Sequence, residues 1–185
     1  MSVITLAEPI PDTSAAPYGT VGVGPMFASV LVGARAGADW AWTLLYRSLA
    51  PRVLAYLRAN GIGTAEAALG DVFARAAAEL DGFDGDERAL QVWVFTIAHA
   101  VVVEECERAD VFVLTGHNIA AEARLAAEIL DPAQRDVVLL AVCADLSPLE
   151  IAGVVDRPIS AVAALERKAY EQLRVQLPLV GSEAP

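Results

Sequence analysis

The stretch Leu146–Leu177 constrains the fold most, because it predicts two helices separated by a tight turn. Ser147, with Glu150 three residues later, has the pattern of a capping box at a helix start. Pro158 must end this short helix, and Ser160 is expected to cap a second, longer one. A short helix, a turn and a longer helix together predict a helix-turn-helix. An ordinary helical hairpin within a bundle is the alternative.

The rest of the chain has helical periodicity and no competing strand pattern. Asp39 and Thr64 are expected to cap two of the helices. The helix over 88–109 is apolar nearly all round, so we expect it at the buried centre of the first bundle. The other helices expected before the helix-turn-helix cover 25–36, 39–60, 64–80, 118–130 and 132–144.

This order of elements predicts an all-α protein with two small helical domains joined by a short linker. Proline and glycine without helical period predict flexible tails at both ends. The expected division is a tail over 1–24, a four-helix domain over 25–109, a linker over 110–117, a helix-turn-helix domain over 118–177 and a tail over 178–185.

The composition is that of a folded chain, with 56% hydrophobic and 20% charged residues among 185. The longest apolar run, Val92–Val103, is too short to cross a bilayer, and no secretion signal is evident, so we expect a cytoplasmic protein without membrane contact. Cys106 and Cys143 lie on separate apolar helices and are expected to be buried thiols. His99 and His117 have no companion ligands, so we expect no metal and no cofactor.

Charge argues against strong binding to nucleic acid. The formal net charge is -11, with 24 acidic and 13 basic residues, and Lys168 is the only lysine. Proteins that bind phosphate backbones usually present a basic face, because counterion release supplies most of the affinity. DNA should therefore repel the chain as a whole.

Short groups of residues follow one another in a recognisable order over about 28–177. They are Leu45-Tyr46, Pro51-Arg52-Val53, Tyr56-Leu57, Ala65-Glu66, Asp71-Val72-Phe73, Phe83-Asp84-Gly85-Asp86, Trp93, Thr96-Ile97-Ala98, Arg108, Leu130, Gln134-Arg135, Val138-Leu139-Leu140, Leu146-Ser147, Glu150-Ile151-Ala152, Val162, Ala169 and Leu173-Arg174. In this order and spacing the chain resembles bacterial RNA polymerase sigma factors of the extracytoplasmic-function (ECF) group. The resemblance implies a sigma-2-like bundle that docks on the polymerase and reads melted promoter DNA. It also implies a sigma-4-like domain that reads an upstream element.

Two functional surfaces implied by the resemblance, the polymerase-docking surface and the promoter-melting face, are altered in this sequence. Docking on the polymerase or another partner falls to Glu66, Asp71 and Phe73, but Thr64, Ala67 and Gly70 replace the family's acidic pair and glutamine. The equivalents of the promoter-melting face are Trp93, His99, Glu104 and Arg108. Here Ala98-His99-Ala100 replaces Ala-Arg-Asn, and Glu104 and Glu105 are expected to point carboxylates where the family presents cations.

The helix-turn-helix departs in the same direction. Its implied functional residues are Ser147, Glu150, Arg157, Ser160, Ala163, Ala164, Arg167 and Lys168. Where the family usually has Lys, Ser and Arg, this chain has Ala163-Ala164-Leu165, which offers no hydrogen bonds to base edges. Arg157, Arg167, Lys168 and Arg174 remain for phosphates. An exposed run of Ala and Leu suits packing against another protein.

Three functions stay open. The first is a sigma-like regulator of transcription initiation that acts by protein contact, with the RNA polymerase core or an anti-sigma-type protein as partner, weakened promoter binding, and self-association left open. The second is a working ECF sigma factor. The third is a helical small-molecule sensor, for which His99, Glu104 and Glu105 near Trp93 are the candidate residues. No nucleophile with its base, phosphate loop or metal spacing is evident, so we expect no enzyme.

Overall fold

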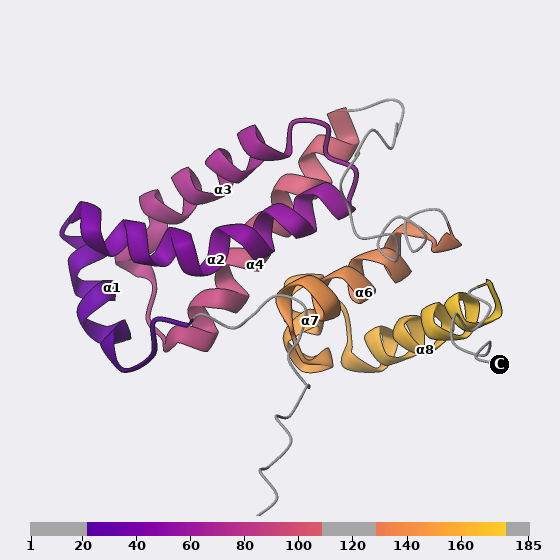
Figure 1. Cartoon of the computed structure of the whole chain (residues 1–185). Coiled ribbons are helices and arrows are strands. Elements are labelled where there is room, and N and C mark those ends of the chain that lie inside the picture. Colours follow the sequence, from indigo (N-terminus) through magenta and orange to yellow (C-terminus); the bar gives the residue numbers. More distant parts are fainter. Residues whose placement is uncertain (1–21, 109–128, 177–185) are drawn as a thin grey trace, which may run out of the picture.

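The computed structural model describes residues 22–108 and 129–176. Within these ranges every regular element is a helix, which confirms the all-α prediction. The elements are η1 (Gly24–Met26), α1 (Phe27–Arg35), α2 (Asp39–Ala59), α3 (Ala65–Glu79), η2 (Leu80–Gly82), α4 (Glu87–Arg108), α6 (Pro132–Ala144), α7 (Pro148–Val154) and α8 (Ile159–Gln176). We call α1–α4 the N-terminal bundle and α6–α8 the C-terminal helices (Figure 1). Most of the expected tail over 1–24, the linker over 110–117, nearly all of the helix over 118–130 and the tail over 178–185 lie outside the described residues.

The capping box predicted at the start of α7 is confirmed. The Ser147 side chain accepts a hydrogen bond from the backbone N–H of Glu150, and the Glu150 carboxylate accepts one from the Ser147 N–H at 2.7 Å. These bonds satisfy two of the amides that a helix start leaves without partners. The start of the helix-turn-helix is therefore encoded locally.

Of the other predicted caps, only the position of Thr64 is confirmed. Thr64 is the N-cap residue of α3 but forms no side-chain cap bond, and Asp39 is the first residue of α2 rather than its cap. Ser160 lies inside α8, because the Pro158 carbonyl already accepts the helical bond from Val162 N at 3.1 Å. A proline that precedes a helix needs no donor of its own, so α8 can begin directly after it.

Helix α4 occupies the centre of the fold, as predicted. It packs against α2 and α3 of its own bundle and against α6 and α7 of the C-terminal helices. Tyr56 of α2 and Phe95 of α4 are both fully buried and meet edge to face, with ring centroids 5.8 Å apart. By length and composition α4 would pass as a membrane span, yet Phe95, Ala98 and Val101 lie in the core.

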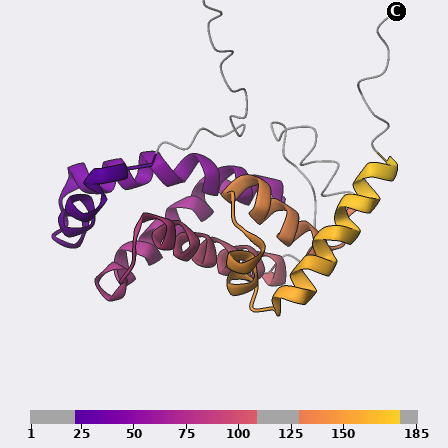
Figure 2. The ribbon, with the colours of Figure 1, turned by 90° about the horizontal axis from the view of Figure 1, so that it is seen from below.

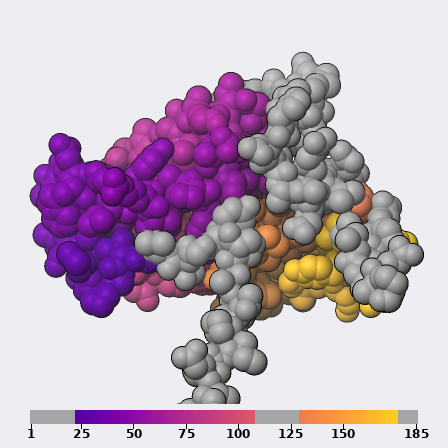
Figure 3. Space-filling model, in the orientation of Figure 1, coloured from indigo at the N-terminus to yellow at the C-terminus, as the bar shows by residue number. Residues whose placement is uncertain are grey.

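One hydrophobic core runs through both groups of helices. Leu140 and Cys143 of α6, and Ile151 of α7, belong to the same buried cluster as Val53 and Phe95 of the N-terminal bundle. Helix α8 lies outside, against α6 and α7 and away from α1 and α3 (Figures 1 and 2). In the space-filling view the two groups form one continuous body (Figure 3). We call this packing the closed arrangement.

The two cysteines differ in exposure. Cys143 is buried in the shared core, but Cys106 is exposed near the end of α4. The prediction of two buried thiols is therefore wrong for Cys106, whose place on α4 leaves its side chain open to solvent.

Candidate functional site

The junction between the two groups of helices is organised around the C-terminal end of α6. Helix α6 stops because Asp145 adopts the left-handed conformation, with φ of 53°. The last carbonyls of a helix have no partners within it and carry the negative end of the helix dipole. Here those carbonyls face the N-terminal bundle, so they need donors from α2 and α4.

Arg52 of α2 supplies two of these donors. Its Nε donates to the Cys143 carbonyl at 3.3 Å, and its Nη2 donates to the Ala144 carbonyl at 3.1 Å. The residue is only 8% exposed, and burial lowers the pKa of its guanidinium below its usual range. A buried cation placed on a helix C-terminus is stabilised by the dipole that it faces.

Arg88 and Gln91 of α4 complete the contact. The Arg88 guanidinium binds both oxygens of the Glu150 carboxylate at 2.7 Å, and its Nη2 also donates to the Asp145 carbonyl. The Gln91 amide donates to the Ala144 carbonyl. Hydrogen bonds from Arg88 are the main cause that lowers the pKa of Glu150 from 4.5 to about 2. We call the residues that bind across this junction the clamp: Arg52, Arg88, Gln91 and Glu150.

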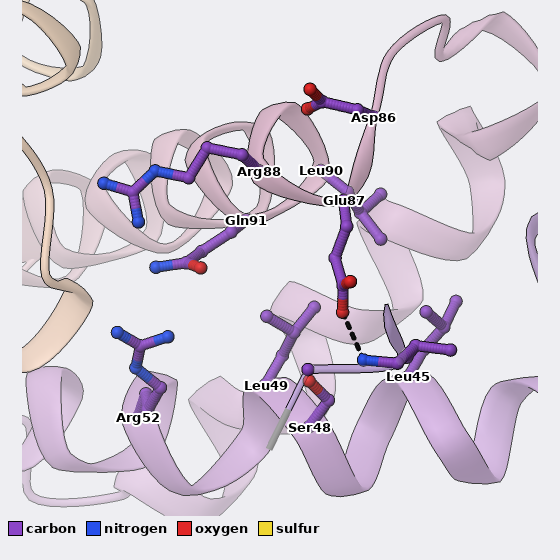
Figure 4. Close-up of a pocket in the computed structure, with 11 residues that line it drawn as sticks. Leu45, Ser48, Leu49, Arg52, Asp86, Glu87, Arg88, Leu90 and Gln91 are labelled. Carbon is purple, nitrogen blue, oxygen red and sulfur yellow. Dashed lines mark hydrogen bonds between the residues drawn. The ribbon is translucent and has the colours of Figure 1, made fainter. Parts of the chain in front are cut away.

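A cavity of about 350 Å³ lies beside the clamp, between α2 and α4. Leu45 and Leu49 line one wall, and Leu90 lines the opposite one. Figure 4 shows Arg52 and Gln91 at one end of this cavity, on the side of the C-terminal helices. Cationic and amide groups therefore gather at one end, the leucines line the walls, and the Glu87 carboxylate lies at the other end. Sequence reasoning did not select this cavity.

His99 is placed differently from the sequence expectation. It is half-buried on α4, and its Nδ1 lies 3.0 Å from the hydroxyl of the fully buried Tyr56. Burial lowers the pKa of His99, and burial raises the pKa of Asp136 on α6, whose charge acts on the histidine. His99 thus belongs to the packed junction of α2, α4 and α6 rather than to an exposed reading face.

The remaining melting-face equivalents do not form a patch of free carboxylates. Glu104 forms a bidentate ion pair with Arg75 of α3, with both contacts at 2.7 Å. Trp93 is half-buried and packs on Phe83, with ring centroids 5.3 Å apart. Glu104 thus places a carboxylate on this part of α4, as expected from the sequence, and α3 supplies its cation. The side chain of Arg108 lies outside the described part of the chain.

The docking residues lie on the outer side of α3. Glu66 is exposed and pairs with Arg58 of α2, whose hydrogen bond lowers the pKa of Glu66. Asp71 is exposed. Phe73 is half-buried against Tyr46 of α2, with ring centroids 4.8 Å apart. Glu66 and Asp71 are therefore both open to solvent, while Phe73 packs α3 on α2.

On α8 only part of the Ala-Ala-Leu run is exposed. Ala163 faces solvent and Ala164 is half-buried, while Leu165 packs against the shared core. Four cations are exposed on α8 and in the turn before it: Arg157, Arg167, Lys168 and Arg174. The Ala-Ala-Leu run thus lies in an apolar first part of α8, and charged residues follow in its second half.

Among the described residues, no group of three or more His, Cys, Asp or Glu side chains is arranged to hold a metal ion. The small-molecule residues considered from the sequence are not brought together as a site either. His99 faces Tyr56, whereas Glu104 faces Arg75.

The described residues form an N-terminal helical bundle followed by a helix-turn-helix. No protein-family model matches the sequence, and no curated protein matches it. Among solved structures, that of CnrH in complex with the cytosolic domain of CnrY is similar with a TM-score of 0.62 and 21% identity, over 80% of this chain and 94% of that chain. A second is the RsbN–BldN complex, with a TM-score of 0.38 and 26% identity, over 80% of this chain and 99% of that chain. The likeness to CnrH shows the fold.

Proposed function

We propose that this chain is a sigma-like regulator of transcription initiation that acts through protein contacts, with two domains corresponding to the N-terminal bundle and the C-terminal helices. One observation carries the proposal. The exposed start of α8, the recognition helix of a helix-turn-helix, presents Ala163 and half-buried Ala164. Alanine can contact a thymine methyl group but cannot hydrogen-bond a base edge, so this surface suits protein better than promoter DNA.

The charge distribution supports the same proposal. Three cations of the N-terminal bundle are held in ion pairs. These pairs are Arg58 with Glu66, Arg75 with Glu104, and Arg88 with Glu150 of α7. Arg52 is turned into the junction. Few cations of the bundle are therefore left to meet phosphates, while the net charge of -11 opposes approach to DNA.

The partner we propose is an anti-sigma-type protein, with the RNA polymerase core as the other candidate. The structure of CnrH was solved with the cytosolic domain of CnrY bound. A chain with the same fold could present similar helices to such a protein while reading promoters weakly. A regulator with these partners would act in the cytoplasm.

The test is affinity purification of the tagged full chain from its own host, with wild type compared with Ala163→Glu. Ala78→Glu is the matched control, because Ala78 is an exposed alanine on α3. We expect an anti-sigma-type protein to co-purify with wild type and Ala78→Glu and to be lost with Ala163→Glu. Recovery of the polymerase core in near-stoichiometric amount, unaffected by Ala163→Glu, would overturn both the anti-sigma-type partner and the role of Ala163 in contacting it.

A second candidate is a working sigma factor, which a different observation favours. Arg167, Lys168 and Arg174 are exposed on α8, and no ion pair engages them within the described residues. Such cations can contact phosphates. The test is binding of duplex DNA by wild type and by a triple Gln variant of these residues at several salt concentrations. Binding that weakens steeply with salt and is lost in the variant supports this candidate.

A further inference from the structure

The cavity beside the clamp has guanidinium groups with donors to spare. Arg52 uses Nε and Nη2 for the carbonyls of α6, and Arg88 uses Nε and Nη2 for Glu150 and Asp145. No acceptor is assigned to Nη1 of either arginine within the described residues. Both arginines line the cavity. An anion at this end could therefore bind both groups without displacing α6 or α7.

The two guanidiniums also repel each other. Desolvation is the main cause that lowers the pKa of Arg52; the charge of Asp145 opposes this, and the charge of Arg88 adds to it. An anion in contact with both would relieve this repulsion in a site where water is partly excluded. Two planar guanidiniums match the two oxygens of a carboxylate better than a single lysine would.

The acidic residues at the rim do not cancel this attraction. The Glu87 carboxylate accepts hydrogen bonds from the backbone N–H groups of Val23 and Gly24. Asp86 accepts one from the N–H of Ala89 at 2.8 Å and so caps the start of α4. Figure 4 shows Glu87 at the opposite end of the cavity from Arg52 and Gln91. The rim carboxylates are thus held by backbone amides and lie away from the cationic end.

The body of the cavity is aliphatic. Leu45, Leu49 and Leu90 are almost fully buried, and all three line it. A volume of about 350 Å³ lies in the range of small-molecule pockets. The site therefore combines one cationic end with apolar walls, which suits a ligand that has one anionic group and an aliphatic body.

We propose that the cavity between α2 and α4 binds a small carboxylic acid, whose carboxylate contacts Arg52 and Arg88 and whose aliphatic chain packs on Leu45, Leu49 and Leu90. Because both arginines also hold the C-terminal helices, the bound carboxylate stabilises the closed arrangement. The binding itself does not depend on the proposed function in transcription.

The test is calorimetric titration of the full chain with hexanoate at fixed ionic strength. Hexanamide has the same aliphatic chain as hexanoate but no charge, and acetate has the charge but no aliphatic chain. We expect saturable one-to-one binding of hexanoate, with a dissociation constant of about 1 mM or lower. Hexanamide and acetate should each bind about tenfold more weakly, because each loses one half of the recognition. Hexanoate should also raise the melting temperature.

A matched pair of variants locates the site. Ser48→Glu places a carboxylate one helical turn before Arg52, where it would occupy the guanidinium and repel the ligand. Thr43→Glu places the same charge one turn before Arg47, on the exposed face of α2 outside this cavity. We expect Ser48→Glu to weaken hexanoate binding about tenfold or more and Thr43→Glu to leave it unchanged.

Three results would overturn the proposal. These are no saturable binding of hexanoate up to about 10 mM, equal affinity for hexanamide, or unchanged hexanoate binding by folded Ser48→Glu. Thermal unfolding of each variant establishes that it is folded. The comparison of hexanoate with hexanamide uses wild type alone, so it decides the question even if a variant fails to fold.

Discussion

Arg88 and Glu150 lie 62 positions apart in the sequence and form a two-pronged ion pair, with both oxygens of the carboxylate 2.7 Å from guanidinium nitrogens. The pair joins the first turn of α4 to the first turn of α7. Glu150 also accepts hydrogen bonds from Ser147, so one carboxylate starts the helix-turn-helix and fastens it to the N-terminal bundle.

Replacing Arg88 should weaken the closed arrangement. In Arg88→Met, Glu150 loses its cation and the Asp145 carbonyl loses a donor. The Arg88 side chain is 40% exposed, so solvent screening limits the loss to about 1–2 kcal/mol of unfolding free energy. Urea unfolding measures it, with Arg47→Met as control because Arg47 is exposed on α2. Equal losses in both variants would contradict the role of the pair.

The same pair should make stability depend on acid. The pKa of Glu150 is about 2 in the folded chain and about 4.3 in an unfolded one. The unfolded state therefore binds the proton first as the pH falls. The stabilisation is fully present above about pH 4.3 and disappears as the pH approaches 2.

Urea unfolding of wild type and Arg88→Met between pH 6 and pH 2 isolates this contribution, because other carboxylates titrate in both proteins. We expect the difference between their unfolding free energies to shrink across the window from about 4.3 to about 2. A difference that stays constant with pH would show that the ion pair does not cause it.

Arg52→Met should cost more than Arg88→Met. Arg52 is 8% exposed, and its loss removes the donor of the Cys143 carbonyl and one of the two donors of the Ala144 carbonyl. We expect a loss of about 2–4 kcal/mol in unfolding free energy. Small-angle scattering would show whether the chain also expands. A compact variant with wild-type stability would mean that water replaces the guanidinium without cost.

Cys143 should report opening of the closed arrangement. It is buried beside Arg52, and burial raises its pKa to about 11, so its thiol should be inert while the helices stay packed. In a Cys106→Ser background, a thiol reagent should label Cys143 slowly in wild type and much faster in Arg52→Met. Equal rates would indicate that Cys143 is reached without separation of the helices.

Local patterns predicted more of the fold than of the junction. The bounds of α6 and the capping box of Ser147 and Glu150 follow from neighbouring residues, and both are found as predicted. The cap predicted at Ser160 failed because Pro158 already fixes the helix start. The partners of Arg52 and Gln91 lie more than 50 positions away, so no local pattern could name them. The one sequence signal for this contact was the position of Arg52 next to the apolar stripe of α2.

The candidate reading faces show the same limit. Composition predicted an acidic surface, but it could not show that Glu104 is matched by Arg75 from the neighbouring helix. Likewise, the resemblance to the family placed Leu165 in an exposed run, whereas α8 turns this side chain toward the core. Pairing across helices depends on how the elements cross, which a single sequence does not specify.

The shared core gives α4 and α8 a fixed separation, since α6 and α7 lie between them and pack on both. A partner that touches both helices at once must match this span, so the protein selects partners by geometry as well as by chemistry. A partner that needs a different span must first uncover Leu140, Cys143 and Ile151, whose contact with water is unfavourable. The shared core thus sets the distance that any partner binding both helices must span.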